Sequence, residues 1–219
     1  MARASDKKQI LAMIKAIDLQ RSPEVLDVGT GYGDMLELLN EEKFKTTGVE
    51  INSMMVNYCR GKGLNCLTPK EFEETSTIYD IIIMSQVIEH FSPSSLFQFI
   101  DGYLDRLHME GFLLIATPLM SPNFYDDFDH VRPYTPQAIY QAFVAEKPKI
   151  KYISRNRLKT FKIQRGKSRL RPSESHALYL MQHPLIAKCE DRVASLLFRV
   201  SGGVIGRTDT WFGLFRKKA

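Results

Sequence analysis

Hydrophobic and polar positions alternate between two patterns along most of the chain. Short runs of nearly continuous apolar residues are separated by stretches whose apolar residues are spaced three and four apart. The first pattern is typical of strands buried in a parallel sheet, and the second of helices that cover one. Strands are predicted at residues 24–28, 46–51, 64–67, 79–85, 111–118 and 208–216, and helices at 35–44, 53–63, 92–108 and 135–146. The alternation predicts an α/β fold with parallel strands and crossover helices.

The pattern is less regular after residue 146. Residues 149–164 are predicted to be rich in strand and very basic, and residues 173–203 to form one or two helices interrupted near Pro184. The sequence has no internal repeat and no sign of an independent second domain. We therefore divide the chain into a core, residues 1–146, and a C-terminal portion, residues 147–219, which completes the sheet and contributes to substrate binding.

The net charge of +5 hides an uneven distribution. Residues 1–146 contain 12 Lys and Arg against 21 Asp and Glu, whereas residues 147–219 contain 18 against 4. Such an excess of positive charge indicates an acidic partner: a phosphate-bearing substrate, nucleic acid or an anionic lipid surface. A basic face that is only solvated explains the charge equally well.

Features that bear on location favour the cytoplasm. The three cysteines have no metal-like spacing and are too few for a disulfide framework. The N-terminal residues lack the apolar core of a signal peptide, and no apolar run is long enough to span a membrane. We expect a soluble, cytoplasmic protein, with peripheral membrane contact through residues 194–206, "ASLLFRVSGGVIG", as one alternative.

Candidate chemistry is concentrated in "VLDVGTGYGDML", residues 25–36. A strand that runs through a glycine turn into a helix creates a ligand-sized space at the carboxyl edge of a sheet. Dinucleotide sites use the spacing G-x-G-x-x-G, whereas the glycines here are Gly29, Gly31 and Gly33, and residue 34 is an aspartate. Two nearby acids, Asp27 and Asp34, would repel a pyrophosphate. The sequence therefore disfavours a dinucleotide.

S-adenosyl-L-methionine (SAM) fits these residues better because it has an ammonium group, a cationic sulfur and no phosphate. Asp27 ends the first strand, where it suits the ammonium, and Gly29 and Gly31 allow the backbone to approach the cofactor. Gly33 is expected to permit helix packing instead. Glu50 ends the second strand, where a carboxylate can accept both hydroxyls of a ribose.

The chain also resembles the class I SAM-dependent methyltransferases. "VLDVGTGYGDML" is similar to their first motif, "TTGVEIN" (46–52) to the acidic motif of the second strand, and "YDIIIMSQVIEHF" (79–91) to the motif of the fourth. "GFLLIATP" (111–118) followed by "DHVRPYTPQAI" (129–139) resembles the branch that includes ubiquinone-biosynthesis O-methyltransferases.

The resemblance implies a Rossmann-like, doubly wound, mostly parallel seven-stranded sheet with a helical insertion. Residues 208–216 would form its antiparallel C-terminal strand. It also implies that Gln86 contacts the methionine moiety of SAM, although a polar residue that only begins a helix is nearly as good an explanation.

Two histidines are candidates for the proton acceptor of the reaction. His90 follows the fourth strand, and His130 lies in "DDFDHVRPYTP" (126–136), which should overhang the cofactor. Either histidine can instead serve only to hold a loop. The acids Asp126, Asp127 and Asp129 lack a further defined ligand set, so no metal is expected.

These features predict a SAM-dependent methyltransferase that acts on an oxygen, less favourably a nitrogen, of a small or lipid- or nucleotide-linked acidic acceptor. The alternative is a catalytically silent protein of the same fold that binds nucleic acid or anionic membrane through its basic C-terminal third. No RNA-binding motif is recognisable, so nucleic acid is the less favoured partner.

Overall fold

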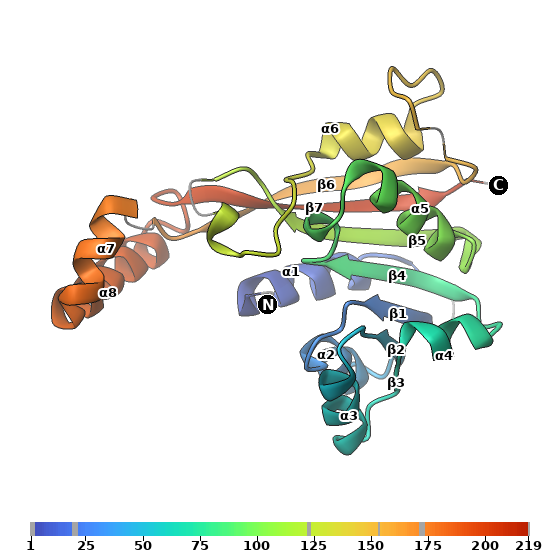
Figure 1. Ribbon diagram of the computed structural model, residues 1–219, viewed down its shortest axis with the longest axis horizontal. Coiled ribbons are helices and arrows are strands. Elements are labelled where there is room, and N and C mark those ends of the chain that lie inside the picture. Colours follow the sequence, from blue (N-terminus) through green and yellow to red (C-terminus); the bar gives the residue numbers. More distant parts are fainter. Residues whose placement is uncertain (1–2, 19–21, 122–123, 153, 171–173, 219) are drawn as a thin grey trace.

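The computed structural model describes residues 3–18, 22–121, 124–152, 154–170 and 174–218, and its central feature is a seven-stranded sheet (Figure 1). The strands are β1 (Glu24–Val28), β2 (Lys45–Val49), β3 (Cys66–Leu67), β4 (Tyr79–Ser85), β5 (Leu107–Pro118), β6 (Leu158–Ser168) and β7 (Arg207–Lys217). Their order across the sheet is β3-β2-β1-β4-β5-β7-β6. Neighbours from β3 to β5 pair in parallel, and β7 is antiparallel to both β5 and β6. The predicted Rossmann-like sheet with an antiparallel C-terminal strand is confirmed.

Helices cover both faces of the sheet. They are α1 (Ala4–Lys15), α2 (Asp34–Glu41), α3 (Ser53–Gly61), α4 (Pro69–Glu74), α5 (Pro93–Leu104), α6 (Pro136–Ile139), α7 (Glu174–Gln182) and α8 (Pro184–Val200). Apolar side chains of α1 and α2 pack on one face, and those of α4, α5 and α6 on the other. A small cluster joins α3 to α2. The helices α7 and α8 form a hairpin that extends away from the sheet (Figure 1).

Three of these helices begin with the same local signal. The side chains of Thr68, Ser92 and Thr135 each accept a hydrogen bond from a backbone N–H of the first turn, and a proline follows each of them. A proline at this position has no N–H to leave unpaired, and its fixed φ suits a helix start. The starts predicted at residues 92 and 135 are therefore correct to within one residue.

The predicted ends of elements are less accurate. The helix predicted to reach residue 108 ends at Leu104, because β5 begins at Leu107 rather than at residue 111. The register shift between Tyr79 and Ile81 lets this earlier part of β5 join the sheet. The helix predicted for residues 135–146 changes into a π-helical turn at Tyr140–Val144.

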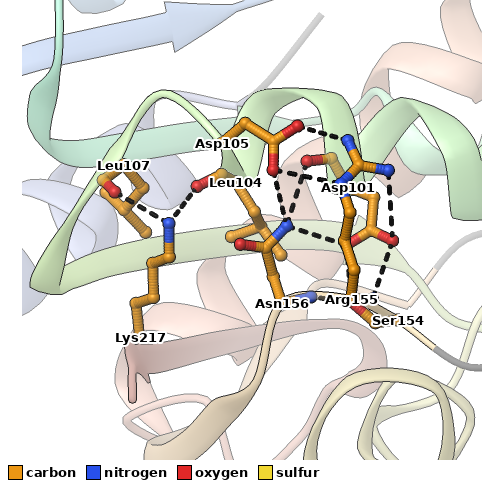
Figure 2. Close-up of polar contacts among 8 residues, drawn as sticks. All are labelled: Asp101, Leu104, Asp105, Leu107, Ser154, Arg155, Asn156 and Lys217. Carbon is orange, nitrogen blue, oxygen red and sulfur yellow. Dashed lines mark hydrogen bonds and ion pairs between the residues drawn. The ribbon is translucent and has the colours of Figure 1, made fainter. Parts of the chain in front are cut away.

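Polar contacts fasten the C-terminal strands to α5 (Figure 2). The buried carboxylate of Asp101 accepts hydrogen bonds from the hydroxyl of Ser154 and the amide of Asn156, just before β6. At the end of β7, the ammonium of Lys217 donates to the carbonyl oxygens of Leu104 and Leu107, at 2.6 and 3.0 Å. These contacts hold β6 and β7 in one sheet with the preceding strands.

Candidate functional site

A groove crosses the carboxyl edge of the sheet, where β1, β2 and β4 end. The chain passes from β1 to β2 and β3 on one side and then returns to β4 on the other, so the connections leave a crevice at this edge. A cavity of about 170 Å³ lies beside Asp27 and Ser85, and one of about 1020 Å³ lies beside Glu50. Gly29 and Gln86 line both cavities, which therefore adjoin each other, and together we call them the groove.

The glycine loop leads from β1 into α2 with three left-handed residues. Gly29, Gly31 and Gly33 have φ angles of 72°, 58° and 82°. A Cβ atom on Gly33 would lie 2.5 Å from the side chain of Leu64, so this glycine permits close packing, as expected. A Cβ atom on Gly31 would meet nothing within 4 Å and would project into open space. The loop therefore exposes bare backbone to the groove at Gly31.

Glu50 lies directly after β2 and organises the glycine loop. One carboxylate oxygen accepts a hydrogen bond from the backbone N–H of Gly31 at 2.9 Å, and the other accepts one from Asn52 at 2.9 Å. Only 7% of the residue is exposed. Because a carboxylate oxygen can accept more than one hydrogen bond, both oxygens remain able to accept a ligand hydroxyl from the groove.

Asp27 is the deeper of the two acids. Its carboxylate accepts a hydrogen bond from the hydroxyl of Thr30 at 2.6 Å, and the residue is 3% exposed. Burial is the main cause that raises the pKa of Asp27 to about 7; the hydrogen bond from the Thr30 hydroxyl opposes this shift, and the negative charge of Glu50 adds to it. A cation beside Asp27 would reverse this shift, so the position favours a positively charged ligand.

Gln86 lies directly after β4 and lines each of the three cavities at this edge of the sheet. It has a φ of 58°, a left-handed conformation rare outside glycine, and its backbone N–H donates to Ala116 at 2.8 Å. It lines both halves of the groove and a third cavity of about 160 Å³. Beside it, the buried hydroxyl of Ser85 has no hydrogen-bond partner among the described residues. A ligand in the groove can supply that partner.

The two candidate histidines lie side by side, with ring centroids 5.0 Å apart. Nδ1 of His90 lies 3.0 Å from the carbonyl oxygen of Asp129, and Nδ1 of His130 lies 2.5 Å from that of Phe124. A carbonyl can only accept a hydrogen bond, so in a neutral ring each Nδ1 carries the proton and Nε2 is free to accept another. The structure thus brings both predicted residues together in a form that suits a proton acceptor.

Glu89 lies next to these two histidines. It is fully buried, and one carboxylate oxygen accepts a hydrogen bond from the hydroxyl of Thr117 at 2.9 Å. The other oxygen has no partner among the described residues. Burial raises the pKa of Glu89, whereas the nearby His90 and His130 oppose that shift. An ionised Glu89 would stabilise an imidazolium on either histidine.

One side-chain cluster could hold a metal ion. Glu89, His90 and His130 each place one ligand atom within 4.8 Å of the others. Among the acids after β5, Asp127 accepts a hydrogen bond from the backbone N–H of Asp129, and its carboxylate lies 3.7 Å from Nε2 of His130. The expectation that the protein needs no metal remains a prediction.

The third cavity is lined by charged side chains of both signs. Gln86 and His130 line it together with three arginines, Arg3, Arg169 and Arg207, and two aspartates, Asp6 and Asp209. Arg3 is neutralised by the carboxylates of α1 and β7, whereas Arg207 has no ion pair among the described residues. The cavity can therefore take an anionic group next to Arg207.

Comparison with known proteins identifies the family. A family model described as a methyltransferase domain matches residues 3–161. The chain belongs to this methyltransferase family. The predicted identity as a class I SAM-dependent methyltransferase is thus confirmed, and SAM is its cofactor. The more specific resemblance to ubiquinone-biosynthesis O-methyltransferases stays a prediction.

Solved structures share the fold at low sequence identity. A SAM-dependent methyltransferase from Archaeoglobus fulgidus is 20% identical, with a TM-score of 0.60 over 99% of this chain and 95% of that chain. The N-methyltransferase NodS from Bradyrhizobium japonicum, in complex with S-adenosyl-L-homocysteine, is 12% identical, with a TM-score of 0.60 over 98% and 87%. The YcgJ protein from Bacillus subtilis is 15% identical, with a TM-score of 0.59 over 96% and 98%. A search of curated proteins found no match.

The groove of this methyltransferase fits SAM at both ends. Asp27 and the unpaired hydroxyl of Ser85 would hold the methionine end, and Glu50 the ribose. Ile51 and Met55 line the larger cavity beyond Glu50 and offer apolar surface to the adenine ring. The roles of Asp27, Gly29, Gly31, Glu50 and Gln86 remain predictions, but all five residues line this one groove.

Sequence reasoning missed two site residues, Ser85 and Glu89. Ser85 is the last residue of a predicted strand, and Glu89 is an acid inside the apolar "VIEHF". Their distinguishing property is a buried atom without a partner, which depends on tertiary packing. The only signal available for Glu89 was an acid next to a candidate histidine.

Proposed function

We propose that this methyltransferase transfers the methyl group of SAM to an oxygen of a small acceptor that bears a phosphate or another acidic group, free or linked to a lipid or nucleotide. The observation that carries this proposal is the third cavity, whose lining includes the unpaired cation of Arg207, the candidate base His130 and Gln86. An anionic acceptor would be held by the first and deprotonated by the second.

SAM supplies an electrophilic methyl group on a cationic sulfur. The residues of the chain would orient the two reactants and exclude water, because proximity and alignment account for much of the rate in such a displacement. Asp27 and Glu50 would hold SAM in the groove, and the arginines would hold the acceptor in the third cavity. Gln86 lines all three cavities, so the reacting atoms would meet beside it.

An oxygen acceptor needs a base, and the histidine pair supports this choice. Nε2 of His130 is free to take the proton of a hydroxyl as its oxygen attacks the methyl carbon, while the neighbouring Glu89 stabilises the resulting positive charge. Since a neutral amine needs no base before it attacks, the buried carboxylate beside two imidazoles favours oxygen over nitrogen.

A labelling experiment tests this function. Purified protein is incubated with SAM that carries an isotopically labelled methyl group and with small-molecule and lipid fractions of a cell extract. We expect label in a compound that binds an anion exchanger, with the methyl group on oxygen by NMR. The Arg207→Gln variant should raise KM for the acceptor at least about tenfold, since a charge-assisted contact is lost. Labelling of an uncharged compound, or of nitrogen, would contradict the proposal.

A further inference from the structure

The hairpin of α7 and α8 exposes an apolar surface that nothing in the described chain covers. No residue of α8 is fully buried. Leu185 and Val200, near its two ends, are 76% and 79% exposed, and Val193 and Leu196 between them are more than half exposed. Figure 1 shows the hairpin beyond the end of the sheet, away from the helices that cover it.

Positive charges lie along one edge of this apolar face. At about 100° per residue, Leu185, Val193 and Val200 share one face of α8, and three basic residues form a stripe beside it. The stripe consists of Lys188, Arg192 and Arg199, all of which are exposed. None of the three forms an ion pair within the described part of the chain.

The acids of α8, in contrast, are neutralised inside the hairpin. Glu190 pairs with His176 of α7 at 2.9 Å, and Asp191 pairs with Arg169, which follows β6, at 2.6 Å. Arg169 also donates to the hydroxyl of Ser195 at 2.7 Å. These contacts fix the orientation of α8, and they leave the outward surface with apolar side chains and unpaired cations.

We propose that α8 docks on the surface of an anionic phospholipid bilayer, with its apolar face in the headgroup region and its basic stripe against lipid phosphates. An amphipathic helix with basic residues beside its apolar face has the composition of helices that lie in a membrane interface. No helix among the described residues is long and apolar enough to cross a bilayer, so the contact is peripheral.

Charge favours a bilayer over a second copy of the chain as the partner that covers this face of α8. The acids Glu190 and Asp191 of α8 are paired within the described structure, whereas its three basic residues are not. Packing of two such faces against each other would therefore bring two rows of unpaired cations together. Anionic lipid, in contrast, complements both the apolar face and its basic edge.

The residues on either side of the hairpin also line the third cavity. Arg169 and Arg207 flank the hairpin and also line the third cavity with His130. If the proposed function holds, docking would bring this cavity close to an acceptor at the lipid surface. The docking itself does not depend on the reaction, so failure of one proposal leaves the other intact.

A native cysteine allows a direct test. Of the three cysteines, only Cys189 is exposed, and it lies in α8. An environment-sensitive fluorophore on Cys189 should shift to shorter wavelength when vesicles containing about one third phosphatidylglycerol are added, and not with phosphatidylcholine alone. The same fluorophore on a Cys189→Ser/Ser76→Cys variant should show no shift, because residue 76 lies in an exposed loop of the core.

Sedimentation with the same vesicles separates local docking from general charge attraction. Lys188→Gln/Arg192→Gln/Arg199→Gln should weaken binding at least about tenfold, and so should Leu185→Ser/Val200→Ser. The matched control, Lys8→Gln/Lys70→Gln/Lys147→Gln, removes the same charge from exposed residues elsewhere and should change binding less than about twofold. Circular dichroism checks that each variant is folded.

Equal losses in the control and in the α8 charge variant would overturn the proposal, as would absence of a fluorescence shift on anionic vesicles. A dimer in solution that Leu185→Ser/Val200→Ser dissociates would assign the face to a second copy instead.

Discussion

The ionisation of Asp27 is expected to couple cofactor binding to pH. Burial raises its pKa to about 7 in the free protein, and only the ionised form attracts the cation of SAM. We expect the affinity for SAM to fall as the pH decreases below about 7, by up to about tenfold per pH unit, because binding must displace a proton. Calorimetry between about pH 6 and pH 8 measures this, and Asp27→Asn should remove the slope. If the affinity of that variant depended on pH to the same extent, the pH dependence would belong to another group.

The raised pKa of Asp27 also makes the free energy of unfolding depend on pH. Native Asp27 keeps its proton up to about pH 7, whereas the unfolded chain releases it near the ordinary value of about 3.9. The folded state therefore binds more protons between these values, and the Asp27 contribution to the free energy of unfolding decreases as the pH rises through this window.

His130 is expected to take the acceptor proton. His130→Asn should lower kcat about a hundredfold or more, as loss of a general base does, with little change in KM for SAM, because the residue lies outside the cofactor groove. His90→Asn should have a smaller effect, since His90 lines the groove rather than the acceptor cavity. Steady-state kinetics with the acceptor decides, and a normal kcat for His130→Asn would contradict this role.

The cluster of Glu89, His90 and His130 is expected to work without a metal, because the methyl group of SAM is already activated by its sulfonium. Dialysis against a chelator should leave kcat within about twofold of its original value. Loss of activity that a divalent cation restores would instead identify the cluster as a metal centre.

Much of the cofactor groove could be predicted at the level of single residues, because the ends of adjacent parallel strands meet in space. Asp27, Glu50 and Gln86 each sit at or just after a strand that the apolar pattern made evident. Ser85 and Glu89 could not be found in this way, since their unpaired buried atoms follow from packing between β4, β5 and the loops around them.

Among the elements, the contact between α5 and the segment before β6 should control stability. Asp101→Ala would leave the buried hydroxyl of Ser154 and the N–H of Arg155 without their acceptor. We expect a loss of about 3 kcal/mol in the free energy of unfolding, measured by urea denaturation. Asp105→Ala removes a half-exposed carboxylate that pairs with Arg155 and accepts one hydrogen bond from Asn156, whose amide keeps Asp101 as an acceptor; we expect a cost of about 1 kcal/mol or less. Similar losses in both variants would contradict a special role for the buried carboxylate.

The sequence predicted central strands and proline-marked helix starts well, and other boundaries less well. The strands at residues 24–28 and 79–85 have the predicted limits, because both are short apolar runs between clear turns. The beginning of β5 contains polar residues, such as His108 and Glu110, and joins the sheet only through an irregular register with β4. Tertiary pairing, not local pattern, sets that boundary.

At the scale of the whole molecule, the uneven charge follows the architecture. The acidic core carries the groove, and the basic C-terminal portion supplies the residues of β6 and β7 and Arg169 that line the third cavity. The order of strands could be inferred only through the family resemblance, since apolar periodicity does not specify which strands are neighbours.

Calorimetric titration of SAM into the unaltered protein and its Glu50→Gln variant tests the central claim most directly. This substitution keeps the size of the side chain but replaces one carboxylate oxygen with an NH2 group, which cannot accept a hydrogen bond from a ribose hydroxyl. We predict micromolar binding to the unaltered protein, affinity at least about a hundredfold lower in Glu50→Gln, and no change in the exposed control Glu74→Gln. Equal affinity in all three proteins, or no binding of SAM at all, would contradict the account.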